Sequence, residues 1–595
     1  MDTTTAGREQ IEERLREACG LDTPWALVER FSTLVRLAGS EPEREAVAYV
    51  MGELDRFGVP YTLHTPVRYI SWPLGATLRT LGGDPLVARP KTVSFSVSTG
   101  GVEREGDLVH LSTGYAEDAT SLFDLGEVGD VDVRGKVVIT EGIPIETKVA
   151  EITRRGAIAA IFAGQGTRIH EGICSDVWGS PDLESLRRYP AIPLLAINEP
   201  DGQALIERAR RGGCRVALST DVDTRWREIP VLVAEIQGAT VPDEFVLVHG
   251  HLDSWHVGVG DNATGDATLL ELARVFHQFR SQLARSIRIA WWSGHSQGRY
   301  AGSGWYADAF AIDLAENCVA HVNCDSPGCR WATEYRDVPW TEEAGPVATA
   351  AGRVATGEPV TRARASRAGD WSFNNLGLSG LFMLSSSMPE SVRVEKGYYA
   401  VGGCGGNIEW HTEDDTLEIA DRDVLLRDIR VYATAGWRLA TAPVPELDFR
   451  LTLDEMGRTL TGYQVIAGER FDLGRADADL AALRADLDYF YRRLDEQDLT
   501  DAADPVARRA SLVQRKLARI LLPVHNARLG RFRQDPADVS PPLPELEVVR
   551  RLAAAEAGSD VAQAARISLE RGLNRLIWAL RRADEVVTGA GVVEA

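Results

Sequence analysis

The sequence predicts an α/β protein with a mostly parallel central sheet flanked by helices, an inserted β-rich domain and a C-terminal helical domain. Short apolar runs alternate with helical patterns in residues 1–94 and 226–442, which is typical of a parallel sheet covered on both faces. Residues 95–225 contain short strand patterns separated by turns, whereas residues 443–595 are almost entirely helical in pattern. Because 595 residues exceed what one core normally organises, we expect these four segments to form three domains.

The main domain is predicted to begin with helices at residues 23–37 and 43–57, followed by a short strand at 61–64. Ser40 and Glu43 form a capping-box pattern before the second helix, and both helices carry apolar stripes that predict packing on a sheet. The inserted domain shows strand patterns at residues 131–139, 158–163 and 191–197, and the C-terminal domain shows helical patterns at residues 478–493, 505–522, 544–557 and 561–587.

The clearest unit in the sequence is a strand, a loop and a helix within residues 246–279. The apolar strand 246–248 leads into a Gly-rich loop, and the helix from about residue 263 repeats apolar residues at helical spacing. Ligands in α/β sheets bind beyond the carboxyl ends of the strands, so this loop is a candidate site. The remaining predicted elements of the main domain are strands at residues 286–292, 318–324 and 378–385 and a helix at residues 421–440.

The composition excludes several classes of partner. Lys plus Arg number 65 against 87 Asp plus Glu, and a net charge of −22 argues against nucleic acid or an anionic membrane surface. No run of about 18 apolar residues occurs, and the N-terminus lacks the apolar stretch of a secretory signal, so we expect a cytoplasmic protein. Seven cysteines without a CxxC pair fit a reducing compartment.

Three residues of the central loop have the chemistry of a metal site. His251 is a suitable zinc ligand, Asp253 can accept the other imidazole N–H and fix the tautomer, and Asp261 can bridge two ions through its two oxygens. By itself the pattern more often marks polar residues of a surface loop. Asp325 and His411 strengthen the metal hypothesis, because they follow other predicted strands of the same sheet.

Together these motifs resemble the zinc aminopeptidase family that includes glutamate carboxypeptidase II and the transferrin receptor. The resemblance rests on GHLDSW, DNATG, HVNCDSPG and WHTEDDT, and it extends to a protease-associated domain around Gly135 and a dimerisation domain at the helical end. It implies that His251 and Asp325 hold one ion, that His411 holds a second, and that Asp261 joins them. It also implies a homodimer through the helical domain.

The sequence departs from this family at one motif. Where the family has two consecutive Glu residues, a general base and a metal ligand, this chain has His295 and Ser296. A serine hydroxyl is a poor zinc ligand. His295 is therefore either a metal ligand itself or the base of a one-metal enzyme, or else catalysis has been lost.

Other polar residues near these motifs have weaker assignments. Arg299 and Tyr300 follow the altered motif and are candidates for binding an anionic or polar substrate group, and His256 is a candidate substrate contact in the central loop. His249 is predicted to be a core or supporting residue. Asp370 falls where the family has a turn that supports the fold, so it is predicted to be structural.

We expect a metal-dependent hydrolase that cleaves the C–N bond of a small peptide or amide, with His251, Asp261, Asp325 and His411 as ligands and His295 as base. The alternatives are a non-catalytic member of the family that serves binding or assembly, and non-peptidase chemistry at a single metal. Zinc, as one ion or two, is the cofactor that the resemblance implies, although His and Asp ligands also suit manganese, cobalt or nickel.

Overall fold

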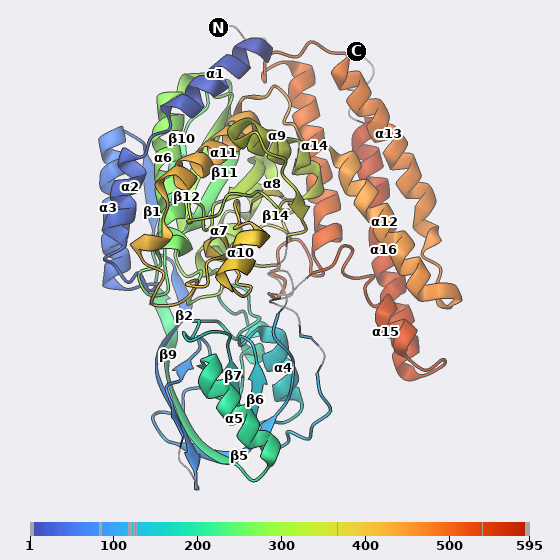
Figure 1. The fold of residues 1–595 in the computed structure, drawn as a ribbon. Helices are drawn as coiled ribbons and strands as arrows, with labels where there is room; N and C mark the ends of the chain where they lie inside the picture. Colours follow the sequence, from blue (N-terminus) through green and yellow to red (C-terminus); the bar gives the residue numbers. More distant parts are fainter. Residues whose placement is uncertain are drawn as a thin grey trace.

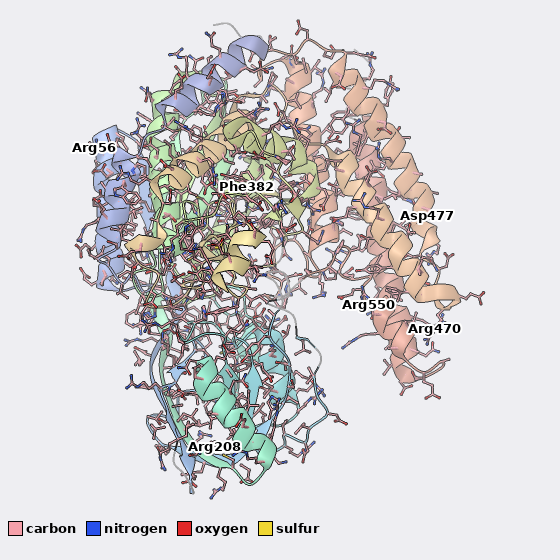
Figure 2. The ribbon with its side chains drawn as sticks, in the orientation of Figure 1. Arg56, Arg208, Phe382, Arg470, Asp477 and Arg550 are labelled. Atoms are coloured by element: carbon pink, nitrogen blue, oxygen red, sulfur yellow. The ribbon has the colours of Figure 1, made fainter. Side chains whose placement is uncertain are left out.

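The structure is a computed structural model that describes residues 5–82, 86–116, 122, 125–126, 128–365, 367–382, 384–537 and 540–589. It has three parts (Figure 1): a main domain built around one sheet, an inserted region with a second sheet below it, and a helical region beside it. The buried Phe382 lies inside the main domain, whereas Asp477 and Arg550 lie on the outside of the helical region (Figure 2).

The main-domain sheet has six strands, and their order places the candidate site. The order is β1 (Tyr61–His64), β10 (Val231–Ile236), β12 (Arg285–Trp292), β11 (Val241–His251), β13 (Cys318–Asn323) and β16 (Ser379–Leu381). The last four of these strands are mutually parallel, while β1 and β10 pair antiparallel at one edge. The sheet is thus parallel where it carries the candidate site and mixed overall.

Both faces of the sheet are covered because alternate side chains of β11 enter two different cores. Val246 and Val248 pack in the larger core with helix α6 (Thr264–Gln278). Phe245 and Leu247 pack in a second core on the other face. The larger core also contains α2 (Asp22–Phe31), α3 (Glu41–Phe57), α9 (Gly345–Thr356) and α11 (Arg422–Thr441), and the second contains α7 (Ala301–Ala309) and α8 (Ala311–Asn317).

Of the two helices predicted near the N-terminus, one has the predicted N-cap and the other ends earlier than predicted. The Ser40 side chain accepts a hydrogen bond from the Glu43 backbone N–H at 3.3 Å, so the predicted N-cap of α3 is present. The helix predicted at residues 23–37, however, ends at Phe31. Arg36 is fully buried and donates to the carbonyl oxygens of Leu252 and Val257 at 2.8 and 2.7 Å, contacts that require a non-helical chain at that point.

The inserted region begins earlier than the sequence suggested. Its long strands β2 (Val67–Leu81) and β9 (Arg215–Glu228) pair antiparallel along almost their whole length, so the expected boundary after residue 94 lies inside the second sheet. The sheet order is β3 (Val87–Ala88), β2, β9, β5 (Arg104–His110), β6 (Val137–Glu141), β7 (Ala159–Ala163), β8 (Leu194–Ile197) and β4 (Lys91–Thr92). Two helices accompany it, α4 (Glu146–Arg154) and α5 (Glu199–Arg211), so the region is mixed α/β rather than purely β.

The helical region packs its helix α14 against the main domain. The helices of this region are α12 (Phe449–Ala467), α13 (Asp477–Asp495), α14 (Pro505–Asn526), α15 (Val549–Ala554) and α16 (Asp560–Gly589). Two further helices, α1 (Thr5–Ala18) and α10 (Glu390–Lys396), lie outside it. Glu244 at the start of the central strand forms buried ion pairs with Arg285 at 2.9 Å and with Arg515 of α14 at 3.0 Å. Among the described residues, no helix is long and apolar enough to cross a bilayer.

Candidate metal centre

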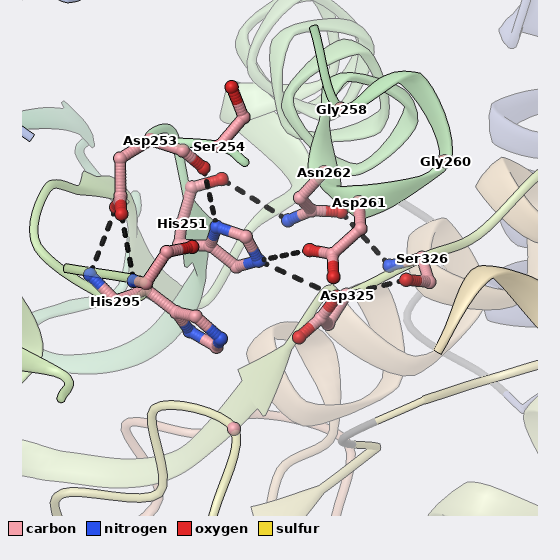
Figure 3. A network of polar contacts seen from close by, with 12 residues as sticks. His251, Asp253, Ser254, Gly258, Gly260, Asp261, Asn262, His295, Asp325 and Ser326 are labelled. Atoms are coloured by element: carbon pink, nitrogen blue, oxygen red, sulfur yellow. Dashed lines mark hydrogen bonds and ion pairs between the residues drawn. The ribbon is translucent and has the colours of Figure 1, made fainter. Parts of the chain in front are cut away.

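The four expected ligands lie at the edge where the parallel strands end. His251 is the last residue of β11, and Asp325 follows two residues after β13. Asp261 lies in the short turn η3 (Val259–Ala263) that leads into α6, and His411 lies in the loop before α11. Figure 3 shows His251, Asp261 and Asp325 side by side, so residues that are far apart in the sequence converge at one point.

Asp261 lies between the two imidazoles of this group. Its Oδ1 is 2.9 Å from Nε2 of His251, and its Oδ2 is 3.0 Å from Nε2 of His411. Oδ1 of Asp325 is 3.7 Å from the same nitrogen of His251. One carboxylate thus has an oxygen toward each histidine, so Asp261 can contact an ion held by either imidazole.

The residues fit a divalent transition metal. The His251 side chain has no exposed surface, yet within the described part of the chain its Nε2 has no hydrogen-bond partner of acceptable geometry, although two carboxylates lie near it. A buried polar atom without a partner is costly, and coordination to a cation removes that cost. Imidazole and carboxylate ligands suit zinc and also manganese, cobalt and nickel.

The site is strongly polarised even without an ion. Burial raises the pKa of Asp261, but the imidazoles of His251 and His411 at its two oxygens outweigh burial and hold that pKa well below its usual range. Burial lowers the pKa of His251, but Asp325 and Asp261 outweigh it and raise that pKa well above its usual range. The Asp261 carboxylate and the His251 imidazole thus stabilise each other's charged forms, and a cation that binds His251 would have to displace its proton.

Asp253 does not orient His251 in the way expected from the sequence. Nδ1 of His251 lies 2.9 Å from the backbone carbonyl oxygen of Asp253, and not against its carboxylate. The carboxylate instead accepts hydrogen bonds from the backbone N–H groups of His295 and Ser296, at 2.9 and 2.8 Å. Asp253 therefore fixes the altered motif through its side chain and His251 through its backbone.

The inserted region holds His411, a contact that the sequence did not reveal. Nδ1 of His411 lies 3.0 Å from the carbonyl oxygen of Glu171, and the Glu171 N–H donates back to the carbonyl oxygen of His411 at 2.8 Å. Arg168 forms a bidentate ion pair with Asp414, at 2.7 and 2.9 Å. Two contacts from one segment therefore set the direction of the His411 ring.

Asp415 is a second residue that the sequence analysis missed. Its carboxylate accepts hydrogen bonds from the backbone N–H groups of Gly260 and Asp261, at 2.7 and 3.1 Å. Burial raises the pKa of Asp415 to about 7. Its position four residues after His411 in the WHTEDDT motif was the only available signal, and the structure shows that it supports the turn carrying Asp261.

His295 lies beside the candidate ligands, but its orientation differs from theirs. Its ring stacks on the His251 ring with centroids 3.7 Å apart and planes inclined by only 18°. An ion bonded to both imidazoles would lie in both ring planes, about 2.1 Å from each nitrogen. The planes of the His251 and His295 rings are nearly parallel and 3.7 Å apart between centroids, so they do not intersect within about 2.1 Å of the ring nitrogens. One ion therefore cannot lie in both planes and bind both rings. Although His251, His295 and Asp325 have ligand atoms within 4.8 Å of one another, the orientation of the rings separates His295 from the ligands.

A cavity of about 580 Å³ opens beside this group. Asp261, Asp325, His411, His295 and Ser296 all line it. The inserted region contributes Ile143 and Ile173 to its wall, and the helical region contributes Ser540. All three parts of the chain therefore enclose one space large enough for a small ligand.

The three substrate-binding candidates behave differently in the structure. Arg299 and Tyr300 line the cavity, whereas His256 is not among its lining residues and lies 3.3 Å from a carboxylate oxygen of Glu171. Arg299 is already paired, with Glu146 at 3.2 Å and with two backbone carbonyl oxygens. The expectation that Arg299 is available for an anionic substrate group is therefore corrected, because burial has forced this cation to find partners within the protein.

A second group of potential ligands, Glu342, Glu455 and His525, lies where the main domain meets the helical region. Arg362 pairs with Glu342, and Arg364 lies 2.9 Å from Glu455. Two guanidinium groups already balance the two carboxylates, so a dication would be repelled. We interpret this group as a structural ion network.

His249, two residues before His251, is a core residue whose tautomer can be derived. An indole N–H can only donate a hydrogen bond, and Nε1 of Trp292 lies 2.9 Å from Nδ1 of His249. Nδ1 is therefore the acceptor, and the proton of the neutral His249 ring is on Nε2. That nitrogen faces Nδ1 of His321 at 3.1 Å. Burial lowers the pKa of His249 to about 3 and that of His321 well below its usual range. Both histidines are therefore neutral in the folded protein.

This pair makes the fold acid-sensitive. In the unfolded chain each histidine takes up a proton below about pH 6.5, whereas folded His249 does so only near pH 3, so stability falls as the pH is lowered through this window. We expect the His249 contribution alone to lower the free energy of unfolding by about 2 kcal/mol between pH 6.5 and 5, and His321 to act in the same direction. Urea unfolding of metal-free wild type and His321→Leu measures this, and the variant should show the shallower slope. Equal slopes would contradict the assignment.

Comparisons with known proteins match the part of the chain that carries this site. Residues 232–435 match Peptidase family M28. The chain is 24% identical to the probable glutamate carboxypeptidase VP8 of Zea mays over 49% of its own length and 48% of the relative's. It is 25% identical to carboxypeptidase Q of Mus musculus over 46% of its own length and 58% of the relative's. The matches thus span about half of each of these relatives.

Solved structures show the same fold. A zinc aminopeptidase from Bacillus subtilis superimposes with a TM-score of 0.53 at 17% identity, covering 70% of this chain and 95% of the other. The aminopeptidase from Aneurinibacillus sp. strain AM-1 gives a TM-score of 0.52 at 18% identity, covering 72% and 95%. The four ligand positions, the sheet edge and these matches lead to one assignment. Residues 232–435 of this chain form a domain of peptidase family M28.

Proposed function

We propose that this chain is a zinc-dependent hydrolase that cleaves a C–N bond in a small peptide or amide. The observation that carries this proposal is the convergence of His251, Asp261, Asp325 and His411, the last three of which line the cavity. A bound zinc ion would supply the Lewis acidity that makes water nucleophilic at neutral pH. His295 lines the same cavity and is the proposed general base in place of the family's glutamate.

The side chains around the cavity favour an uncharged group next to the scissile bond. At the cavity wall Glu146 and Arg299 form an ion pair at 3.2 Å, and Arg393 is likewise bound to Glu390 at 2.6 and 2.7 Å. A charged substrate group would lose its hydration and would compete with these pairs, whereas an apolar group gains from burial. We therefore infer neutral rather than acidic substrates.

The retained carboxylates favour an enzyme over a non-catalytic scaffold. Asp261 and Asp325 are buried beside histidines at a cavity wall, an arrangement that costs desolvation energy and that a pure scaffold does not require. A scaffold would be free to replace them with apolar residues of similar size.

Removal of the metal tests this proposal. We expect treatment with a chelator to abolish hydrolysis of neutral dipeptides and amino acid amides, and added zinc to restore it. In a matched panel of substrates, leucyl substrates should show at least about tenfold higher kcat/KM than glutamyl ones. The glutamyl carboxylate would lose hydration without gaining a partner in the cavity, and a net cost of about 1.4 kcal/mol is enough for a tenfold ratio. Hydrolysis that survives chelation would exclude the metal mechanism. Zinc-loaded protein that hydrolyses no substrate would favour the non-catalytic alternative.

A further inference from the structure

Asp370 makes a contact that its expected structural role does not explain. Its side chain is 1% exposed, and its Oδ2 lies 2.7 Å from Nδ1 of His295. Its Oδ1 accepts a hydrogen bond from the Ser303 hydroxyl at 2.5 Å. The carboxylate is therefore clamped between a serine and the candidate base, and both of its oxygens are used.

A chain of hydrogen bonds holds the carboxylate in this orientation. The Ser303 hydroxyl lies 2.8 Å from the Ser372 hydroxyl, which also accepts a hydrogen bond from Nε1 of Trp178 at 2.8 Å. The backbone on the other side is held as well, because Asn323 donates to the Gly369 carbonyl oxygen at 2.6 Å. Trp178 belongs to the inserted region, so two parts of the chain fix Asp370.

The contact decides which nitrogen of His295 carries the proton. A carboxylate only accepts hydrogen bonds, so Nδ1 of His295 must be the donor, and the lone pair of a neutral ring is then on Nε2. The ring is confined further by stacking on His251 at 3.7 Å and by the edge contact with Tyr300 at 4.7 Å between centroids. His251 and His295 lie next to each other in Figure 3.

We infer that Asp370 is a positioning residue that fixes His295 as the Nδ1–H tautomer and so presents Nε2 to the cavity as the proton acceptor. The inference rests on the proposed function. Nε2 takes a proton from water while the water oxygen forms a bond to the substrate carbonyl carbon and the carbonyl π electrons move to oxygen. The same proton then passes to the leaving nitrogen as the C–N bond breaks. Carboxylate–imidazole pairs act in this way in unrelated hydrolases.

The substitution Asp370→Asn separates this role from support of the fold. Asp370 has a φ of 57°, and asparagine tolerates this left-handed conformation as well as aspartate does. The amide has nearly the same shape and can still accept from Ser303. It can equally present its N–H to Nδ1 of His295, which would favour the opposite tautomer.

The experiment compares wild type, Asp370→Asn and Asp370→Glu as zinc-loaded proteins. We expect the asparagine variant to lose kcat by about 100-fold, within the usual range for proton transfer, with KM changed less than about twofold and with zinc content and thermal midpoint retained. The glutamate variant, which keeps the acceptor, should recover part of kcat. Asp428→Asn is the matched control, because Asp428 is fully buried and hydrogen-bonded to Gly328 and Ser386, and not to His295.

Nitrogen-15 NMR of histidine-labelled protein gives a readout that does not depend on activity. The His295 signals, assigned by their loss in His295→Gln, should show an Nδ1–H tautomer in wild type and in Asp428→Asn, and a change of tautomer in Asp370→Asn. An unchanged tautomer, or an unchanged kcat, in Asp370→Asn would overturn the inference. If wild type binds zinc but hydrolyses none of the amides, the proposed function fails, while the tautomer measurement still decides the role of Asp370.

Discussion

Replacing His295 by alanine is expected to lower kcat by about 1000-fold and to leave the zinc content unchanged. Proton transfer by a positioned side chain contributes roughly 10²- to 10⁴-fold, and this chain has no glutamate at the corresponding position to take over. The zinc content should persist because the ring of His295 is stacked on His251 and is not directed at the same ion. Steady-state kinetics and elemental analysis on the same preparations measure both effects.

A matched control for this variant is His277→Ala, on the outer part of α6. His277 is only half-buried and lies outside the cavity lining, so its loss should change neither kcat nor zinc content. If His295→Ala loses an ion that the control retains, His295 is a ligand and the base must be sought elsewhere. Full activity in His295→Ala would exclude the proposed mechanism altogether.

The sequence predicts the positions of the candidate ligands because each is tied to a local signal. His251 and Asp325 follow apolar strands, and Asp261 precedes a helix with clear apolar periodicity. Strand order in a parallel sheet then brings these residues together without any knowledge of distant contacts. The β11, β12 and β13 strands and the helix α6 lie within a few residues of the ranges expected from the pattern.

The supporting contacts could not be predicted because they join residues that are remote in sequence through irregular loops. The His295 and Asp370 pair spans 75 residues, and the contact between His411 and Glu171 spans 240. Neither residue type nor spacing marks such pairs. Asp370 was assigned to a structural turn from its position alone, although its side chain contacts the candidate base.

Two residues lie near the site as the sequence predicted, but they have partners that the sequence did not reveal. Arg299 lines the cavity as expected, but its partner Glu146 comes from α4 of the inserted region, 153 residues away. Asp253 retains its place beside His251 but contacts it through the backbone. In both cases the residue type showed what chemistry was available, and only the fold showed which partner uses it.

Replacing Asp261 by alanine is expected to remove the metal. Among the described residues, this carboxylate is the one group with ion-pair contacts to both His251 and His411, with one oxygen 2.9 Å from the first and the other 3.0 Å from the second. Loss of a mere supporting partner commonly costs 10- to 100-fold in metal affinity, so loss of this ligand should exceed about 100-fold. Elemental analysis should find close to no zinc, and hydrolysis should be lost with it.

The charge of the site also sets the expected stoichiometry of the wild type. The four candidate ligands are two carboxylates and two imidazoles, which would bind an ion as two anionic and two neutral groups, so this ligand set balances one dication whereas a second would leave an excess of positive charge in a buried site. We therefore expect one zinc ion per chain, and excess zinc should raise the thermal midpoint of the wild type but not of Asp261→Ala. Asp266→Asn provides the control, because Asp266 is fully buried and its side-chain oxygens have no hydrogen-bond partner in the part of the chain that the structure describes. Burial raises the pKa of Asp266 well above its usual range, so burial already disfavours its charge, and the Asp266→Asn variant should bind zinc as the wild type does. Zinc retained by Asp261→Ala would place the ion on other residues, and two ions in the wild type would require a ligand that replaces the family's second glutamate.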